Sequence, residues 1–296
     1  MPRTRQTIAV AGVGDLGKYI CEELLTSSDF SVIVLSRVVH ASLLAACQKS
    51  HTCKRLIPSE WIGDSETYPL KPDYYASTRD PFRKILRAQD EVEWTLFNPG
   101  WLADYFLPRG KTYISPIPDK FPVDPNGWRA CIRGSGEEMQ SWTCGREIGR
   151  AVVELCRAEE WVSGNLTSAA DTIPLWHIEN VTYVAGEWST FNTAVKVMES
   201  HYGTFQLYYL NIVTGWLLPI THKPVEDIQF SLEMHTNNGD DDFEALELAQ
   251  VEEMMIMGYM ACPKEKTMRQ QQKYFADLKS SDLEQLLTYA DGVDFV

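Results

Sequence analysis

The sequence is short of positive charge and has no long apolar run. It contains 27 Lys and Arg against 41 Asp and Glu, so its formal net charge is −14. An acidic chain is repelled by nucleic-acid phosphates and by anionic membrane surfaces, so we expect it to bind neither. A membrane helix needs about 20 consecutive apolar residues. The sequence has no such stretch, so we expect no membrane span.

Cysteines at metal-binding or disulfide spacing are absent as well. The seven cysteines are an odd number, and none of them forms a Cys-x-x-Cys pair. No two histidines have metal-ligand spacing on one element, so we expect no metal site. The apolar residues at 7–11 are too few for a signal peptide. We therefore expect free thiols in a reducing compartment and a cytoplasmic protein.

What the sequence does contain begins with a strand, a glycine turn, a helix and a second strand. Residues 7–11 are β-branched and apolar, which is typical of a buried parallel strand. The glycine motif at 12–17 follows at once, a helix is predicted over 18–27, and a second apolar strand over 31–35. This is the context in which a Gly-x-Gly-x-x-Gly motif binds a dinucleotide. We therefore expect an α/β fold with a Rossmann-like, doubly wound parallel sheet.

The glycine motif reads Gly12-Val-Gly14-Asp15-Leu16-Gly17. Gly12 permits a tight turn, Gly14 lets the backbone approach a pyrophosphate, and Gly17 allows close helix packing. Asp15 and Leu16 open the helix, whose first N–H groups point at the phosphates. These five residues are candidates for cofactor binding. The alternative is a glycine turn that merely packs a helix on a sheet.

Arg37 stands twenty residues after Gly17, where an acidic residue would bind the ribose hydroxyls of NAD. An arginine at this point suits the 2′-phosphate of NADP instead. NADP(H) is therefore the favoured cofactor. The alternative is a surface arginine at the end of a strand.

The pattern breaks after Arg37. A full half of a doubly wound sheet would place a strand, a helix and another strand here, about 40 more residues. The sequence instead predicts one helix over 38–50 and then a strand at 55–61. We therefore expect a shortened sheet that lacks about two strands.

Elements further along the chain are less distinctive. A strand is predicted at 93–97, and helices are predicted over 78–88, 143–157, 190–201, 240–253, 267–278 and 282–290. Pro81 fits only in the first turn of the helix over 78–88. Residues 101–127 are rich in Pro, Gly and aromatics and predict a long loop that helps to form a site.

Four short motifs resemble one protein family. The glycine motif is followed by KRLIPSEW at 54–61, WTLFNPG at 94–100 and SWTCGRE at 141–147, the last before an apolar helix. Together they resemble the NmrA-like and isoflavone-reductase-like proteins, which are atypical relatives of the short-chain dehydrogenases/reductases. The resemblance is strongest to fungal members in secondary metabolism. It covers residues 7–200 and extends only loosely beyond them.

The resemblance implies an NADP(H)-binding domain over 1–150 and a smaller α+β substrate part over 151–296. The two parts would interleave, with an approximate boundary and a cleft for a small apolar substrate between them. The resemblance also places two loops at the nicotinamide end of this cleft. These loops add five residues to the expected cofactor site: Pro58, Ser59, Asn98, Pro99 and Gly100.

Arg79 and Tyr75 are the candidate catalytic residues. Reductases of the family carry a lysine where this sequence has Arg79, and no Tyr-x-x-x-Lys dyad occurs anywhere. A lysine can act as acid or base once its pKa is lowered, whereas an arginine essentially keeps its proton. Arg79 can still hold an oxyanion electrostatically. Tyr75 and the nearby Tyr105 can donate a proton or line an aromatic pocket.

Three functions are consistent with these features. The first is an NADP(H)-dependent oxidoreductase acting on an apolar small molecule, which the glycine motif in its strand context favours. The second is a non-catalytic regulator that senses the dinucleotide and binds a protein partner, for which the acidic stretch 240–253 offers a surface. The third is a truncated, inactive family member whose shortened sheet would fold weakly.

Overall fold

The computed structural model describes residues 5–35, 39–158, 160–161, 177–178, 180–210, 217–237 and 243–296. Helices and parallel strands alternate along its first half, so the expected α/β class is confirmed. Within these ranges, no helix is both long enough and apolar enough to cross a membrane.

The predicted strand, turn, helix and strand are present at the N-terminal end. Strand β1 (Gln6–Ala11) pairs in parallel with β2 (Phe30–Leu35). Helix α1 (Asp15–Thr26) joins the two strands and packs along helix α4 (Gly145–Arg157). The local sequence therefore forms the unit that it predicts, with small shifts at the ends.

Two helices and further short strands follow. These are α2 (His40–Lys49), β3 (Arg55–Leu56), α3 (Asp73–Arg87), β4 (Glu93–Trp94), β5 (Leu96–Asn98) and, later in the chain, β12 (Val181–Tyr183). Strand β3 pairs in parallel with β4, and β5 pairs in parallel with β12. Among the described residues β1 pairs with β2 alone, and α2 is the one element between β2 and β3. These six strands therefore form three separate parallel pairs.

Helices cover both faces of these strands. Adjacent residues of a strand point to opposite sides, and β5 shows this directly. Phe97 belongs to a buried cluster with side chains of α1 and α4. Its neighbour Leu96 belongs to a buried cluster with side chains of α2 and α3. The arrangement is that of a doubly wound fold, with helices on either side.

Helix α3 begins earlier than the sequence predicts. It starts at Asp73, so Pro81 lies in its interior and not in its first turn. The prediction was wrong because proline is a common signal for a helix start. The helix continues past Pro81 because Phe82 and Leu86 are buried in the core, and such packing contributes most of the stability of a helix.

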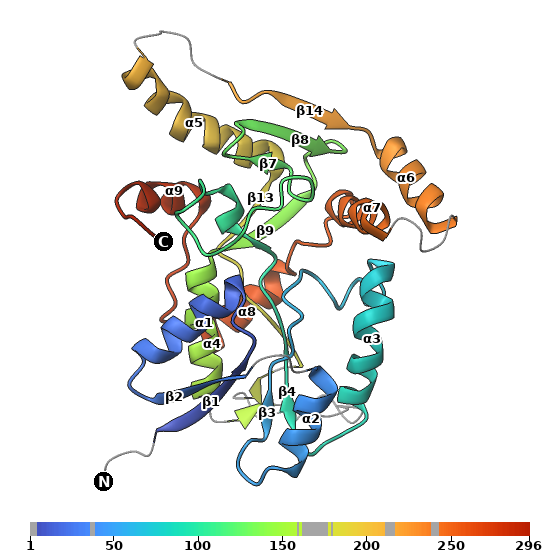
Figure 1. The fold of residues 1–296 in the computed structure, drawn as a ribbon, viewed down its shortest axis with the longest axis vertical. Coiled ribbons are helices and arrows are strands. Elements are labelled where there is room, and N and C mark those ends of the chain that lie inside the picture. The colour runs from blue at the N-terminus through green and yellow to red at the C-terminus, as the bar shows by residue number, and fades with distance from the viewer. Residues whose placement is uncertain are drawn as a thin grey trace.

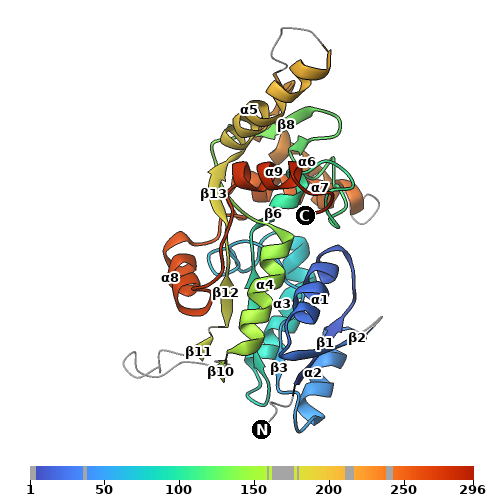
Figure 2. The ribbon, with the colours of Figure 1, turned by 90° about the vertical axis from the view of Figure 1, so that its left-hand side faces the viewer.

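The remaining elements are β6 (Trp101–Leu102), a 3₁₀ helix (Ala103–Phe106), β7 (Val123–Asp124), β8 (Arg129–Arg133), β9 (Met139–Thr143), β10 (Glu160–Trp161), β11 (His177–Ile178), β13 (Glu187–Thr190), α5 (Phe191–Leu210), β14 (Ile220–Lys223), α6 (Val225–Asn237), α7 (Phe243–Ile256), α8 (Lys264–Tyr274) and α9 (Leu283–Asp291). Most of them build a second and larger core above the strand pairs (Figure 1), whereas β10, β11 and α8 lie beside the lower part (Figure 2). Figure 2 shows α8 beside β12, at the edge of the lower part.

Two predictions about this second part were wrong. Residues 101–127 are not one loop, because they contain β6, the 3₁₀ helix and β7. Their aromatic side chains enter the core, where Phe106 and Phe121 have ring centroids 4.9 Å apart. Helix α6 was not predicted, because its apolar pattern is irregular: Ile228 is buried while Phe230 is exposed.

Candidate functional site

The glycine turn has the geometry of a phosphate cradle. Gly12 has φ +87°, which only glycine adopts without strain. A Cβ on Gly17 would lie 2.8 Å from the carbonyl oxygen of Gly12, so α1 can approach the turn only with glycine there. A Cβ on Gly12 or Gly14 would meet no atom within 4 Å. The turn and the N-terminus of α1 therefore leave open space that fits a pyrophosphate.

Asp15 and Leu16 have structural contacts in this turn. The Asp15 carboxylate accepts a hydrogen bond from the Ser115 backbone N–H at 2.8 Å and lies 3.5 Å from Lys18 Nζ. Hydrogen bonding from Ser115 and the charge of Lys18 hold the pKa of Asp15 below its usual range. Leu16 packs against the core of α1 and α4. Asp15 thus fixes the loop around Ser115 beside the glycine turn.

The loop after β3 lies against the N-terminus of α2. The Ser59 backbone N–H donates a hydrogen bond to Nε2 of His40 at 3.2 Å, and Glu60 N–H donates to the Pro58 carbonyl oxygen at 2.9 Å. The His40 ring stacks on Phe82 of α3, with ring centroids 5.2 Å apart. Burial lowers the pKa of His40, so the imidazole is held neutral as the acceptor.

Glu60 is the centre of a buried charge cluster. Its side chain is 1% exposed, and its Oε2 accepts hydrogen bonds from Arg83 Nε at 3.1 Å and from Arg83 Nη2 at 2.5 Å. Arg79 Nη1 donates to the carbonyl oxygen of Glu60 and lies 3.7 Å from Oε2. One glutamate therefore holds two of the three arginines of α3, Arg79 and Arg83.

Tyr75 lies beside this cluster, and Tyr105 is near enough to Tyr75 to feel its charge. The Arg79 guanidinium lies over the Tyr75 ring, 3.8 Å from its centroid. Burial, together with the nearby Asp104, Tyr75 and Asp15, raises the pKa of Tyr105 to about 12. Tyr105 is therefore within electrostatic range of both α3 and the turn. The structure thus brings Arg79 and Tyr75 together on α3, and their catalytic role stays a prediction.

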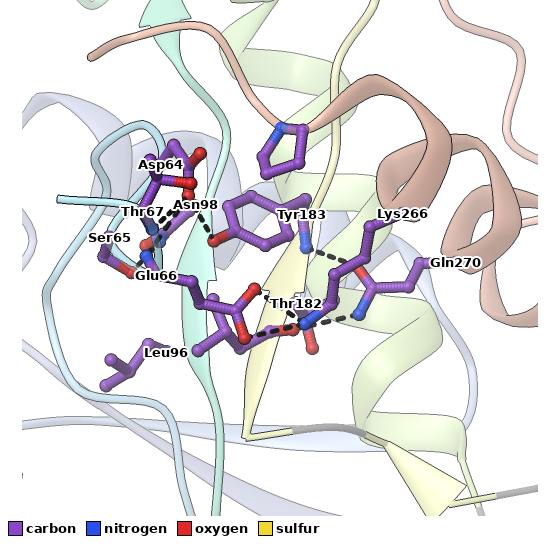
Figure 3. A network of polar contacts seen from close by, with 12 residues as sticks. Asp64, Ser65, Glu66, Thr67, Leu96, Asn98, Thr182, Tyr183, Lys266 and Gln270 are labelled. Carbon is purple, nitrogen blue, oxygen red and sulfur yellow. Dashed lines mark hydrogen bonds and ion pairs between the residues drawn. The ribbon is translucent and has the colours of Figure 1, made fainter. Parts of the chain in front are cut away.

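The turn at Asn98-Pro99-Gly100 is buried among protein contacts. Asn98 Nδ2 donates to Ser65 Oγ at 2.7 Å (Figure 3), and the Pro99 carbonyl oxygen accepts from Thr143 Oγ1 at 2.7 Å. Gly100 has φ +70°, and its N–H donates to the Ile62 carbonyl oxygen at 3.0 Å. These contacts position the ends of β5 and β6, and the expected cofactor contact of this turn stays a prediction.

A polar network ties the loop after β3 to the far end of the chain (Figure 3). Asp64 Oδ1 accepts a hydrogen bond from the Tyr183 hydroxyl at 3.3 Å, and the Tyr183 backbone N–H donates to Gln270 Oε1 at 2.8 Å. Lys266 Nζ of α8 lies 2.7 Å from Glu66 Oε2. The network fixes the loop that carries Glu60, and no local signal in the sequence could have revealed it.

Tyr259 is a site residue that the sequence did not reveal. Its side chain is fully buried, and its hydroxyl has no hydrogen-bond partner among the described residues. Burial raises its pKa far above the usual range, and Arg83, Arg79 and Glu60 all act on it electrostatically. Its carbonyl oxygen accepts from the Asp64 N–H at 2.8 Å. An unpaired hydroxyl beside two arginines is therefore built into the cluster.

Arg37, the predicted ligand of the 2′-phosphate, lies outside the described residues. Within the described ranges, no cluster of three His, Cys, Asp or Glu side chains is placed to hold a metal ion.

Comparisons with known proteins come from sequence and from structure. No family model matches the chain. The oxidoreductase swnR of Metarhizium robertsii is 31% identical over 239 residues, covering 66% of this chain and 73% of that protein. The oxidoreductase swnR of Arthroderma benhamiae is 27% identical over 328 residues, covering 96% of this chain and 97% of that protein.

Two solved structures share the fold at low sequence identity. The structure of AtPrR2 with NADP+ and (+)pinoresinol has a TM-score of 0.64 and 14% identity, over 97% of this chain and 99% of that one. The crystal structure of isoflavone reductase has a TM-score of 0.61 and 14% identity, over the same shares of the two chains. The described α/β architecture is therefore the fold of these two solved structures.

Proposed function

Because this chain belongs to the family of the fungal swnR oxidoreductases, we propose that it is an NADP(H)-dependent oxidoreductase acting on a small apolar molecule in secondary metabolism. The observation that carries the proposal is the open glycine cradle at the N-terminus of α1. The NmrA-like family, the cytoplasmic location and the division into parts 1–150 and 151–296 belong to the same proposal.

The cradle would hold the pyrophosphate of the cofactor, with Gly12, Gly14 and the first N–H groups of α1 as its donors. Arg37 would hold the 2′-phosphate. The similarity to the structure of AtPrR2 with NADP+ supports this choice. The bound nicotinamide would supply or accept the hydride.

The side chains around Glu60 would prepare the substrate for this transfer. Arg79 can donate hydrogen bonds to an oxygen that gains negative charge, because its guanidinium is fixed by the Glu60 carbonyl oxygen and by the Tyr75 ring. It cannot supply a proton, since a guanidinium essentially never ionises. A tyrosine hydroxyl is therefore the proposed proton donor, and Tyr75 is the candidate, because the hydroxyl of Tyr259 is fully buried.

Apolar side chains beside Tyr105 support an apolar substrate, although the depression that they border in this structure has room for only about one water molecule. The walls of this depression include Ile117, Phe121 and Val123. These side chains join the aromatic core of the second part. The substrate would enter between this core and α3.

We also propose that the sheet is shortened by loss of the strands between β2 and β3. The described chain places only α2 between these strands. The alignment with the Arthroderma protein spans 328 positions, more than the 296 residues of this chain, so that relative has segments without a counterpart here. A sheet interrupted beside β1 is the expected result.

Gly14→Ala tests the cradle. A Cβ at this position meets no protein atom, and α1 begins there with φ −75°, so the variant should fold normally. The methyl group should occupy space needed by the pyrophosphate, and we expect NADPH affinity to fall at least tenfold, about 1.4 kcal/mol. Calorimetric titration with NADPH and NADH measures this, with preference for NADPH in the unaltered protein.

The matched control is Gly292→Ala, far along the chain at the end of α9, where a Cβ only touches the Tyr289 carbonyl oxygen at 3.6 Å. It should bind NADPH normally. Equal binding by both variants and the unaltered protein would refute the cradle as the cofactor site.

Tyr259→Phe tests the unpaired hydroxyl. A buried polar group without a partner costs about 1–3 kcal/mol, so we expect its removal to raise the free energy of unfolding by about 1 kcal/mol. Turnover should stay unchanged, because a fully buried hydroxyl does not reach the substrate. Urea unfolding and NADPH consumption with candidate carbonyl or imine compounds measure the two effects.

Tyr68→Phe is the control for the stability and turnover measurements on Tyr259→Phe. The Tyr68 ring lies 5.7 Å from that of Tyr259, and its hydroxyl donates to the Met257 carbonyl oxygen at 3.2 Å. Its loss should lower stability slightly and leave turnover unchanged. A drop in stability for Tyr259→Phe would show that its hydroxyl has a partner.

A second function is a regulator that binds NADP(H) without chemistry and contacts a protein partner. The observation that favours it is Arg79, which stands where the resemblance to the isoflavone-reductase-like proteins implies a lysine. NADPH binding without consumption by any carbonyl or imine compound, together with a co-purifying partner, would favour this reading. A truncated, inactive chain would show neither binding nor a cooperative thermal transition.

A further inference from the structure

Two thiols meet at the C-terminal end of α2. Cys47 Sγ and Cys53 Sγ lie 3.6 Å apart. Cys47 is buried in the core shared by α2 and α3, whereas Cys53 is exposed. The other five cysteines, all within the described residues, make no contact with another thiol. The two sulfurs are thus in contact with each other, but only Cys53 is accessible to solvent.

Local hydrogen bonds hold this contact in place. Ser50 Oγ accepts from the N–H groups of Thr52 and Cys53, at 3.2 and 2.9 Å. Lys54 Nζ donates to the Gln48 carbonyl oxygen at 2.9 Å. These bonds fold the chain back over the last turn of α2. The two sulfurs need to move only a short distance towards each other to reach the S–S bond length of about 2.05 Å.

We propose that Cys47 and Cys53 form a redox-modification site, which closes to a reversible disulfide by exchange with a small disulfide such as glutathione disulfide. The exposed Cys53 thiolate attacks one sulfur of glutathione disulfide, forms a mixed disulfide and releases one glutathione thiolate. Cys47 then gives its proton to solvent, attacks the Cys53 sulfur and displaces the second glutathione thiolate. Two protein thiols are oxidised, and one glutathione disulfide is reduced to two glutathione molecules.

The environments of the two sulfurs support this division of roles. Burial, and then the contact with Cys53, raises the pKa of Cys47 to about 12, so Cys47 stays protonated in the reduced protein. An attacking thiol needs both access and thiolate character. The exposed cysteine therefore reacts first, and the buried one resolves the mixed disulfide.

The disulfide would join the end of α2 to the segment that enters β3. The opposite end of α2 already holds the loop after β3, through the bond from Ser59 N–H to His40 Nε2. Both ends of the helix would then be fixed to the strand that precedes Glu60. We expect the oxidised protein to melt at a temperature higher by at least about 2 °C.

The test equilibrates reduced, full-length protein with glutathione buffers of increasing disulfide fraction, followed by alkylation of the remaining thiols. Intact mass should show a species lighter by two hydrogen atoms, and digestion should recover Cys47 linked to Cys53. Dithiothreitol should reverse the change, and its extent should not depend on protein concentration. A stable glutathione adduct on Cys53, a disulfide-linked dimer or no reaction would each overturn the proposal.

Three variants distinguish the roles of the individual thiols. Cys53→Ser changes an exposed side chain, so it should fold and lose the intramolecular disulfide. Cys47→Ala should stop at the glutathione adduct of Cys53. Cys131→Ser, which alters a half-buried thiol elsewhere, should form the disulfide as before. If Cys47→Ala does not fold, the loss of the intramolecular disulfide in Cys53→Ser tests the proposal by itself. None of these results depends on the proposed cofactor or substrate.

Discussion

Glu60→Ala should lower the free energy of unfolding by about 3–5 kcal/mol, the range expected when one partner of a buried ion pair is removed. Glu60 and Arg83 are 1% exposed each, and their Oε2 and Nη2 atoms lie 2.5 Å apart. Without the carboxylate, the Arg83 guanidinium stays buried without its counter-charge. Urea-induced unfolding measures the loss, after the unfolding has been shown to be two-state.

Asp80→Ala on the same helix is the control. Asp80 Oδ2 lies 2.8 Å from Lys84 Nζ, but the lysine side chain is 73% exposed, and such pairs contribute about 0–1 kcal/mol. The double variant Glu60→Leu/Arg83→Met should recover much of the stability lost by Glu60→Ala, because it removes both buried charges. Equal losses for Glu60→Ala and Asp80→Ala would contradict the buried pair.

Arg79→Met should reduce kcat/KM about 10²–10³-fold, or about 3–4 kcal/mol, if its guanidinium stabilises charge on the reacting oxygen. Most of the loss should fall in kcat, because the interaction strengthens as charge develops. Arg79→Lys should retain more activity than Arg79→Met, since it restores a cation that can also release a proton. Steady-state NADPH oxidation with an active substrate measures both variants.

Lys84→Met is the control for Arg79→Met. It lies one turn further along α3, and its side chain is largely exposed. Its activity should equal that of the unaltered protein. The melting temperature of Arg79→Met must also be measured, because Arg79 donates to the Glu60 carbonyl oxygen. A change in stability alone, with normal kcat, would mean that Arg79 only supports the loop after β3.

The site is assembled from segments that no local pattern connects. Glu60 follows β3, Arg79 and Arg83 come from α3, and Tyr259 follows α7. A motif search finds Arg79 only through a family resemblance, and it finds Tyr259 not at all. The contact between Cys47 and Cys53 was likewise not predicted. The spacing of the seven cysteines indicated no pair, but the fold brings these two together at the end of α2.

The sequence by itself determined the unit of β1, the glycine turn, α1 and β2. Each of these conformations depends on neighbours a few residues away: the apolar runs, the left-handed Gly12 and the small Gly17. The sequence also predicted that only one helix separates β2 from β3, because strand and helix lengths are local properties.

Only the tertiary structure decided which side chains pack together and which charged and polar groups are buried. Helix α3 begins at Asp73 and continues through Pro81, because packing of one helix face against the core outweighs the local helix-breaking effect of proline. The tertiary structure also buried the Glu60–Arg83 pair and left the Tyr259 hydroxyl without a partner. Burial sets the energy of a charge or a hydroxyl, and burial is a property of the whole fold, which a single stretch of sequence does not contain.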